Sequence, residues 1–225
     1  MNRETLEIRK KIVFRGKKSV KKSLAMLFII GSMLMLLSGC TGGSNNKIRL
    51  ANLTVDQQDI VNLLVADSQE VFIFNYQTAN ASAMELWVGV YAYGELVESM
   101  AGLSFSRSGN QSNSLSGRLA VTINYETDGS FVWTFAVIDG NFHATNIVEF
   151  TSDSESFGSR THSPMQEAIA IQDGKDIILH TTKFHSDTVF TDGSRNSQDY
   201  INQPELLAGY QYVILIRARF SMQIL

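Results

Sequence analysis

Two stretches of alternating side chains, residues 116–126 and 130–138, narrow most strongly what this chain can fold into. They read SGRLAVTINYE and SFVWTFAVI, and in both an apolar residue recurs at every second position. A period of two is typical of a β-strand with one buried face. We therefore expect two adjacent strands whose buried faces consist of Leu119, Val121, Ile123 and Tyr125 in the first and Phe131, Trp133, Phe135 and Val137 in the second.

The turn between these strands, residues 127–129, decides their register. A two-residue Asp-Gly turn would place the polar residues Glu126 and Asn124 opposite aromatic ones. A three-residue loop with Gly129 in the left-handed conformation aligns both apolar faces. We predict the second register, in which the pairs are Tyr125 with Phe131, Ile123 with Trp133 and Val121 with Phe135.

Further strands are predicted from β-branched and aromatic residues, with glycine at the turns. They cover Glu70–Gln77, Met84–Tyr93, with a turn at Gly94, and Tyr210–Phe220, and a second hairpin is predicted around Asp173-Gly174. In the last strand, one face carries Tyr212, Ile214, Ile216, Ala218 and Phe220. Many strands with short turns predict a mainly β fold, an antiparallel β-sandwich or a barrel-like sheet, formed by residues 48–225 as a single domain.

One short helix is predicted near the start of this domain. Thr54 and Gln57 match the capping box, and Ile60, Leu63 and Leu64 recur at helical spacing up to about Ala66. We expect this helix to lie against a sheet. Three polar segments are predicted as long loops: Ser104–Ser116, Ser152–Ser163 and Ser186–Gln203.

The N-terminal 39 residues have the layout of a secretory signal peptide. A basic region precedes fourteen uncharged residues, Leu24–Leu37. As a helix these would span roughly 21 Å, less than the roughly 30 Å of a bilayer's hydrocarbon core. The alternative is an uncleaved N-terminal transmembrane anchor, because no charge follows until Lys47.

The only cysteine in the chain, Cys40, directly follows this apolar segment. Leu37-Ser38-Gly39-Cys40 resembles the lipobox of bacterial lipoproteins, in which the cysteine is acylated and becomes the first residue of the mature protein. The resemblance implies that Cys40 carries the lipid and that the domain lies at the outer face of the cytoplasmic membrane. The Gly, Ser and Asn residues of Thr41–Asn46 are typical of a flexible tether, so we expect residues 40–47 to be the lipidated cysteine and its tether. Two acyl chains are enough for stable anchoring.

Charge is divided unevenly between the leader and the body. From Cys40 onward there are ten basic and twenty acidic residues, a formal net charge of −10. An acidic body repels a polyphosphate backbone, so we expect no nucleic-acid partner.

No catalytic signature is present in the sequence, and no cofactor is predicted. G-x-S-x-G, H-E-x-x-H and a glycine-rich phosphate loop are all missing. His180 and His185 would point to opposite faces of one strand, which argues against a shared metal. Residues 192–196 only weakly resemble a calcium loop, because the glycine and glutamate of that motif are missing. We therefore predict no metal site.

Aromatic residues give the one candidate binding surface. Trp87, Tyr91 and Tyr93 alternate on one face of a predicted strand and could form a platform for a sugar ring or a peptide. The alternative is a central strand that is buried on both faces.

Two segments, LWVGVYAYGELV and QPELLAGYQYV, resemble uncharacterised lipoproteins of Gram-positive bacteria, a resemblance that brings no activity with it. The sequence favours a lipid-anchored binding or accessory lipoprotein that is not an enzyme, with an envelope protein or a glycan as partner. The alternative is a hydrolase of cell-envelope polymers that uses carboxylates on its loops.

Overall fold

The computed structural model describes residues 46–64, 69–107, 114–125, 130–151, 159–185 and 196–222. The predicted signal peptide, Cys40, the turn at 127–129 and the loop at 192–195 lie outside these residues. Within the described ranges, no helix has the length and apolarity needed to cross a membrane.

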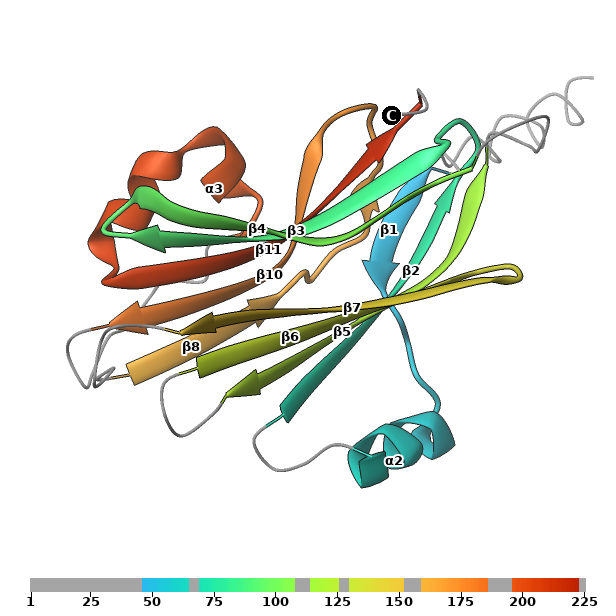
Figure 1. Ribbon diagram of the computed structural model, residues 1–225, viewed down its shortest axis with the longest axis horizontal. Coiled ribbons are helices and arrows are strands. Elements are labelled where there is room, and N and C mark those ends of the chain that lie inside the picture. The colour runs from blue at the N-terminus through green and yellow to red at the C-terminus, as the bar shows by residue number, and fades with distance from the viewer. Residues whose placement is uncertain are drawn as a thin grey trace, which may run out of the picture. The chain divides into compact units, whose positions relative to one another are not determined.

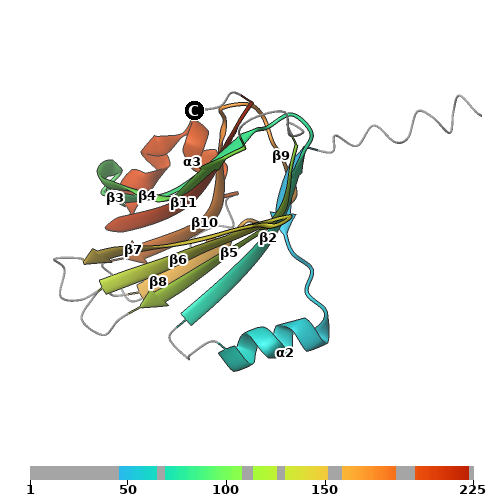
Figure 2. The same cartoon turned by 45° about the vertical axis from the view of Figure 1, so that its right-hand side comes forward.

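Two antiparallel sheets face each other and confirm the predicted sandwich (Figures 1 and 2). The first sheet has six strands, which in spatial order are β7 (Phe142–Thr151), β6 (Ser130–Asp139), β5 (Leu115–Tyr125), β2 (Gln69–Thr78), β1 (Lys47–Leu50) and β9 (Ile169–Ala170). The second sheet has five, which are β4 (Glu95–Ser106), β3 (Ala83–Ala92), β11 (Tyr212–Ser221), β10 (Asp176–His185) and β8 (Ser159–Pro164).

The hydrophobic core lies between the sheets and is built from the predicted apolar faces. Tyr125 pairs with Phe131, Ile123 with Trp133 and Val121 with Phe135, so the predicted register of β5 and β6 is confirmed. The predicted apolar face of β11 also faces this core. Ile123, Trp133 and Ile216 are each at most 1% exposed.

One side of the sandwich is closed where β4 and β7 meet. The rings of Phe105 and Phe142 stack with their centroids 4.9 Å apart. The side-chain amide of Asn146 on β7 donates a hydrogen bond to the carbonyl of Gly102 on β4. These contacts fix the edges of the two sheets to each other.

The predicted helix is α2 (Val55–Leu64), and its capping box is confirmed. The Thr54 hydroxyl accepts from the Gln57 amide at 3.3 Å, and the Thr54 amide donates to the Gln57 side chain at 3.1 Å. The prediction that α2 lies against a sheet is wrong, because Ile60 is 56% exposed and Leu63 is 85% exposed. In Figures 1 and 2 the helix stands apart from the strands.

Asp173-Gly174 forms a turn, with Gly174 at φ 63°, but the predicted hairpin around it is wrong. The strand before the turn, β9, pairs with β1 in the first sheet, whereas β10 after it belongs to the second. The turn therefore carries the chain from one sheet to the other. Part of a predicted loop is also a strand, because Ser159–Pro164 forms β8 and pairs with β10.

A second, smaller core covers part of the outer face of the second sheet. It is formed by the short helices α3 (Asp199–Asn202) and η1 (Pro204–Gly209). Tyr200 and Leu207 pack there against Ile178 and Leu215, which point away from the main core. Among the described residues, this layer leaves the part of the outer face around Trp87 and Arg219 uncovered.

Candidate functional sites

The predicted aromatic platform lies on β3, and the structure divides its members. Leu86, Val88 and Val90 are buried in the main core, whereas Trp87 and Tyr91 are half-buried on the outer face. Tyr91 packs against the small core formed with α3 and η1. The end of β3 at Tyr91 is thus covered on both faces, as in the buried-strand alternative. The part around Trp87 keeps an exposed outer face, as the aromatic platform requires.

Tyr93 does not belong to the platform. It follows the end of β3, has a φ of 48° and is 66% exposed in the turn to β4. Gly94, with a φ of 89°, completes the turn, as the sequence predicted. Of the three predicted platform residues, only Trp87 therefore faces open surface within the sheet.

Trp87 lines a shallow groove of about 450 Å³, here called the outer groove. Its charged residues are Glu85 on β3, Asp176 on β10, and Arg217 and Arg219 on β11. Strand pairing aligns Arg217 with Trp87, and Arg219 with both Glu85 and Asp176. The groove is thus a consequence of the register of three neighbouring strands.

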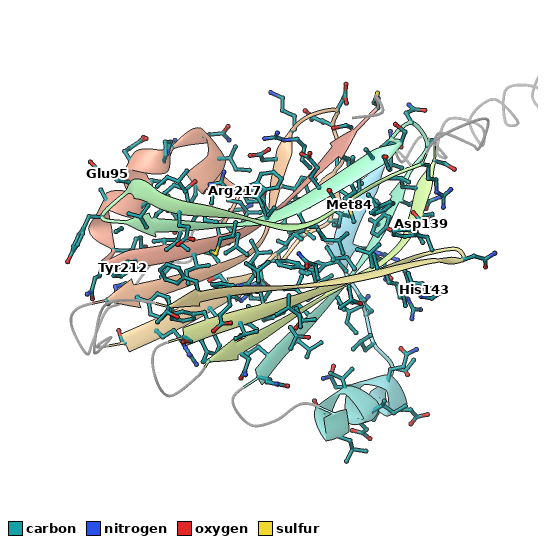
Figure 3. All side chains as sticks on the ribbon, in the orientation of Figure 1. Met84, Glu95, Asp139, His143, Tyr212 and Arg217 are labelled. Atoms are coloured by element: carbon teal, nitrogen blue, oxygen red, sulfur yellow. The ribbon has the colours of Figure 1, made fainter. Side chains whose placement is uncertain are left out.

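Three of the four charged residues of the outer groove, Asp176, Arg217 and Arg219, form ion pairs. Arg219 contacts Asp176 at 2.6 Å, and Arg217 contacts the same carboxylate at 3.5 Å. The Arg219 guanidinium also lies over the Trp87 ring, 5.0 Å from its centroid. Arg217, labelled in Figure 3, donates a hydrogen bond to the Tyr91 hydroxyl. These contacts hold the arginines and the indole in fixed orientations.

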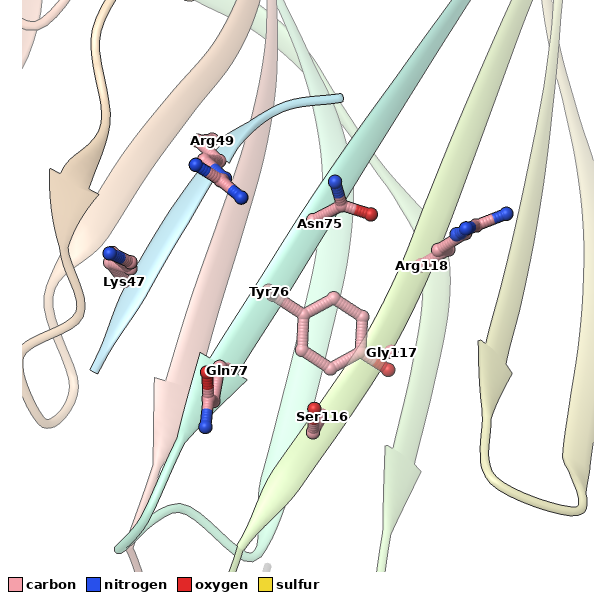
Figure 4. Close-up of a pocket in the computed structure, with 8 residues that line it drawn as sticks. All are labelled: Lys47, Arg49, Asn75, Tyr76, Gln77, Ser116, Gly117 and Arg118. Carbon is pink, nitrogen blue, oxygen red and sulfur yellow. The ribbon is translucent and has the colours of Figure 1, made fainter. Parts of the chain in front are cut away.

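A second depression, on the outer face of the first sheet, is basic (Figure 4). It has a volume of about 260 Å³ and is lined by Lys47 and Arg49 from β1 and Arg118 from β5. Tyr76 lies at its side with its hydroxyl directed toward Asp139, 3.2 Å away. Three cations gather here on a body whose formal net charge is −10.

A polar cluster lies between the two sheets, where Glu70 on β2 faces β8 and β10. His162 Nε2 is 3.4 Å from one Glu70 carboxylate oxygen, and His180 Nε2 is 4.0 Å from the other. Glu70 is 31% exposed, His162 22% and His180 only 1%. We call these three residues the Glu-His-His cluster.

Hydroxyl groups hold the far nitrogens of both imidazoles. Thr182 Oγ1 is 3.5 Å from Nδ1 of His162 and 3.5 Å from Nδ1 of His180. The Tyr125 hydroxyl is 3.1 Å from His162 Nδ1. Both rings are therefore oriented so that Nε2 points toward Glu70.

Burial determines how this cluster titrates. Desolvation lowers the pKa of His162 to about 4, with a smaller contribution from the nearby charge of Arg160. Desolvation also lowers the pKa of His180, to about 3. Desolvation raises the pKa of Glu70, and Arg160 partly offsets this effect. Both histidines are neutral near pH 7, so their Nε2 atoms can act as electron-pair donors.

The sequence did not indicate this cluster. The expectation that His180 and His185 point to opposite faces of β10 is confirmed, because His180 lies in the cluster whereas the ring of His185 meets the Tyr210 ring of the outer layer edge to face. The partners of His180 come instead from β2 and β8. Only the pairing of β8 with β10, which places His162 opposite Thr182, brings the two histidines together.

The described residues thus form an antiparallel two-sheet sandwich with an outer groove and an internal Glu-His-His cluster. Residues 47–220 match the family model of the YgaN domain, so the chain belongs to the YgaN domain family. No curated protein and no solved structure matches the chain.

Proposed function

We propose that this protein is a lipid-anchored lipoprotein that displays a YgaN domain at the outer face of the cytoplasmic membrane and binds an envelope ligand there. The lipobox-like Leu37-Ser38-Gly39-Cys40 after an apolar segment supports the anchor. Lys47 follows Cys40 by seven residues, which span at most about 25 Å when extended. The basic depression at Lys47, Arg49 and Arg118 suits a site near anionic headgroups.

The observation that carries the binding function is the half-exposed Trp87 in the outer groove. An indole held beside charged hydrogen-bonding groups can stack on one face of a sugar ring while its neighbours contact the hydroxyls. The four charged groups, Glu85, Asp176, Arg217 and Arg219, sum to zero net charge. A neutral groove on an acidic body favours an uncharged polar ligand, and a cell-envelope glycan has this chemistry.

The alternative, a polymer hydrolase, has less support from this geometry. Glycoside hydrolysis needs one carboxylic acid that can donate a proton and one free carboxylate. In the outer groove Asp176 is engaged by two arginines, and Arg219 stands between it and Glu85. We therefore propose binding without turnover.

Native gels polymerised with soluble cell-wall glycans test the binding function on the full-length protein in detergent. We expect the glycan to retard the protein, and Trp87→Ala to abolish the retardation while the melting temperature changes little. Tyr93→Ala is the matched control, because it removes an exposed aromatic ring of the same hairpin outside the groove. Equal retardation of all three proteins would refute the role of Trp87.

Metabolic labelling with a palmitate analogue tests the anchor separately. The wild-type protein should carry the label and sediment with membranes. Cys40→Ala should lose the label, because the acylated sulfur is removed. A Cys40→Ala protein that remains labelled would contradict the assignment of the lipid to this residue.

A further inference from the structure

We propose that Glu70, His162 and His180 form a binding site for one divalent transition-metal ion, with Zn²⁺ as the ion that fits best. The ligand atoms of the three residues all lie within 4.8 Å of one another. They come from three strands, β2, β8 and β10, so the register of both sheets sets their spacing. The site is on the inner face of β10 and does not depend on the outer groove.

The distances are close to those of a tetrahedral centre. Two ligands that are each about 2.05 Å from a tetrahedral Zn²⁺ are about 3.3 Å apart. His162 Nε2 and the nearer Glu70 oxygen are 3.4 Å apart, which already matches. His180 Nε2 is 4.0 Å from the other Glu70 oxygen, and a small rotation of the half-exposed carboxylate would close this gap.

The strongest indication of a missing ligand is Nε2 of His180. This residue is 1% exposed, and among the described residues its Nε2 has no hydrogen-bond partner. Burying a polar atom without a hydrogen-bond partner destabilises the folded state, so native structures rarely retain such an atom. A metal ion bound to Nε2 would satisfy it.

The surroundings of the imidazoles are those of metal ligands. A histidine that binds a metal through Nε2 usually donates its Nδ1 hydrogen to a fixed oxygen, which sets the tautomer. Thr182 Oγ1 lies within 3.5 Å of Nδ1 in both rings, and the Tyr125 hydroxyl lies 3.1 Å from Nδ1 of His162. One hydroxyl thus orients both histidines toward Glu70.

The donor set selects the class of metal. Two imidazoles and one carboxylate suit zinc and neighbouring divalent transition metals, whereas Ca²⁺ and Mg²⁺ prefer oxygen ligands alone. Three protein ligands leave a fourth position for water or an external group. Arg160, whose guanidinium lies 3.5 Å from the centre of the Tyr125 ring, is the nearby positive charge that opposes a cation.

Titration of the full-length protein in detergent tests this site, with an affinity tag that contains no histidine and after removal of metals with EDTA. We expect calorimetry to show one Zn²⁺ per chain, and Co²⁺ to give the visible absorption of a four-coordinate centre. His180→Ala and Glu70→Gln should each weaken Zn²⁺ binding at least about tenfold. Because Glu70→Gln changes neither size nor shape, it decides the question even where His180→Ala fails to fold.

Two further variants make the test specific. His143→Ala is the matched control: it removes an exposed histidine on β7, away from the cluster, and should leave Zn²⁺ binding unchanged. Arg160→Ala removes the opposing charge and should strengthen binding. The proposal is overturned if the wild-type protein binds no Zn²⁺, or if Glu70→Gln binds it as tightly as the wild type does.

Discussion

Asp139 at the end of β6, labelled in Figure 3, forms an ion pair with Arg107, which directly follows β4, and so connects one sheet of the sandwich to the other. Asp139 is 2% exposed and Arg107 is 26% exposed. The same carboxylate accepts hydrogen bonds from the Tyr76 hydroxyl and from the Ser116 amide, each at 3.2 Å. A single buried carboxylate on β6 thus holds groups from β2, from β5 and from the residue that follows β4.

We expect Asp139→Asn to lower the free energy of unfolding by about 3 kcal/mol, because it leaves the partly buried Arg107 without its counter-charge. Urea unfolding followed by circular dichroism measures this change. The matched control is Glu149→Gln, an exposed carboxylate on the neighbouring strand β7, which should change stability by no more than about 0.5 kcal/mol. Equal effects of the two variants would show that the ion pair does not stabilise the fold.

Gly117 lies on β5 at a point where this strand comes very close to β6. A Cβ atom at this position would lie 2.0 Å from the Ile138 carbonyl oxygen and 2.8 Å from the Tyr76 hydroxyl. Because the first contact is with backbone, Gly117→Ala should shift β6 and lower the free energy of unfolding by about 2 kcal/mol or more. Gly209→Ala is the control, since nothing lies within 4 Å of its Cβ position, and chemical denaturation compares the two. A Gly117→Ala protein as stable as the wild type would mean that these strands are further apart.

The two tryptophans of the chain should differ in fluorescence. Trp133 is 1% exposed in the core, whereas Trp87 is half-buried in the outer groove. Trp87→Phe should therefore leave blue-shifted emission that iodide quenches weakly, and Trp133→Phe should leave emission that iodide quenches readily. Similar quenching constants for the two variants would contradict the exposure of Trp87 on which the binding proposal depends.

The sequence predicted those parts of the fold that depend on neighbouring residues. The register of β5 and β6 followed from two alternating faces and one short turn, and the cap of α2 followed from Thr54 and Gln57. The packing of α2 and the partner of β9 were not predictable in this way. An apolar residue such as Leu63 shows that burial is possible, but it does not show which surface, if any, covers it.

The candidate sites are formed by residues that are far apart in the chain. For this reason sequence analysis identified only one residue of the outer groove. Trp87 was identified from strand alternation, but Asp176 and Arg217 follow it by 89 and 130 residues and join it only through strand pairing. The Glu-His-His cluster needs, in addition, two sheets in contact. Glu70 and His180 belong to different sheets, and no local pattern relates positions on opposite sheets.

The cluster predicts that the metal-free protein becomes less stable as the pH falls from about 6.5 to about 4. Burial lowers the pKa of His162 to about 4 and that of His180 to about 3, whereas both are near 6.5 in the unfolded chain. Between the pKa of each histidine in the folded protein and its pKa near 6.5 in the unfolded chain, the unfolded chain binds a proton at that histidine and the folded protein does not. The free energy of unfolding therefore falls as the pH is lowered, by at most about 1.4 kcal/mol per pH unit for each histidine.

Other groups that face these histidines modify the size of this effect without changing its sign. Burial raises the pKa of Glu70, so the folded state takes up a proton there more readily, and this offsets part of the loss at the acidic end of the range. The nearby charge of Arg160 is one cause of the lowered pKa of His162, and burial raises the pKa of Tyr125, whose hydroxyl therefore stays protonated over this range. Urea unfolding with EDTA at several pH values measures the slope. His180→Phe should reduce this slope by the share of one histidine, whereas a slope unaffected by His180→Phe would place the titrating groups outside the cluster.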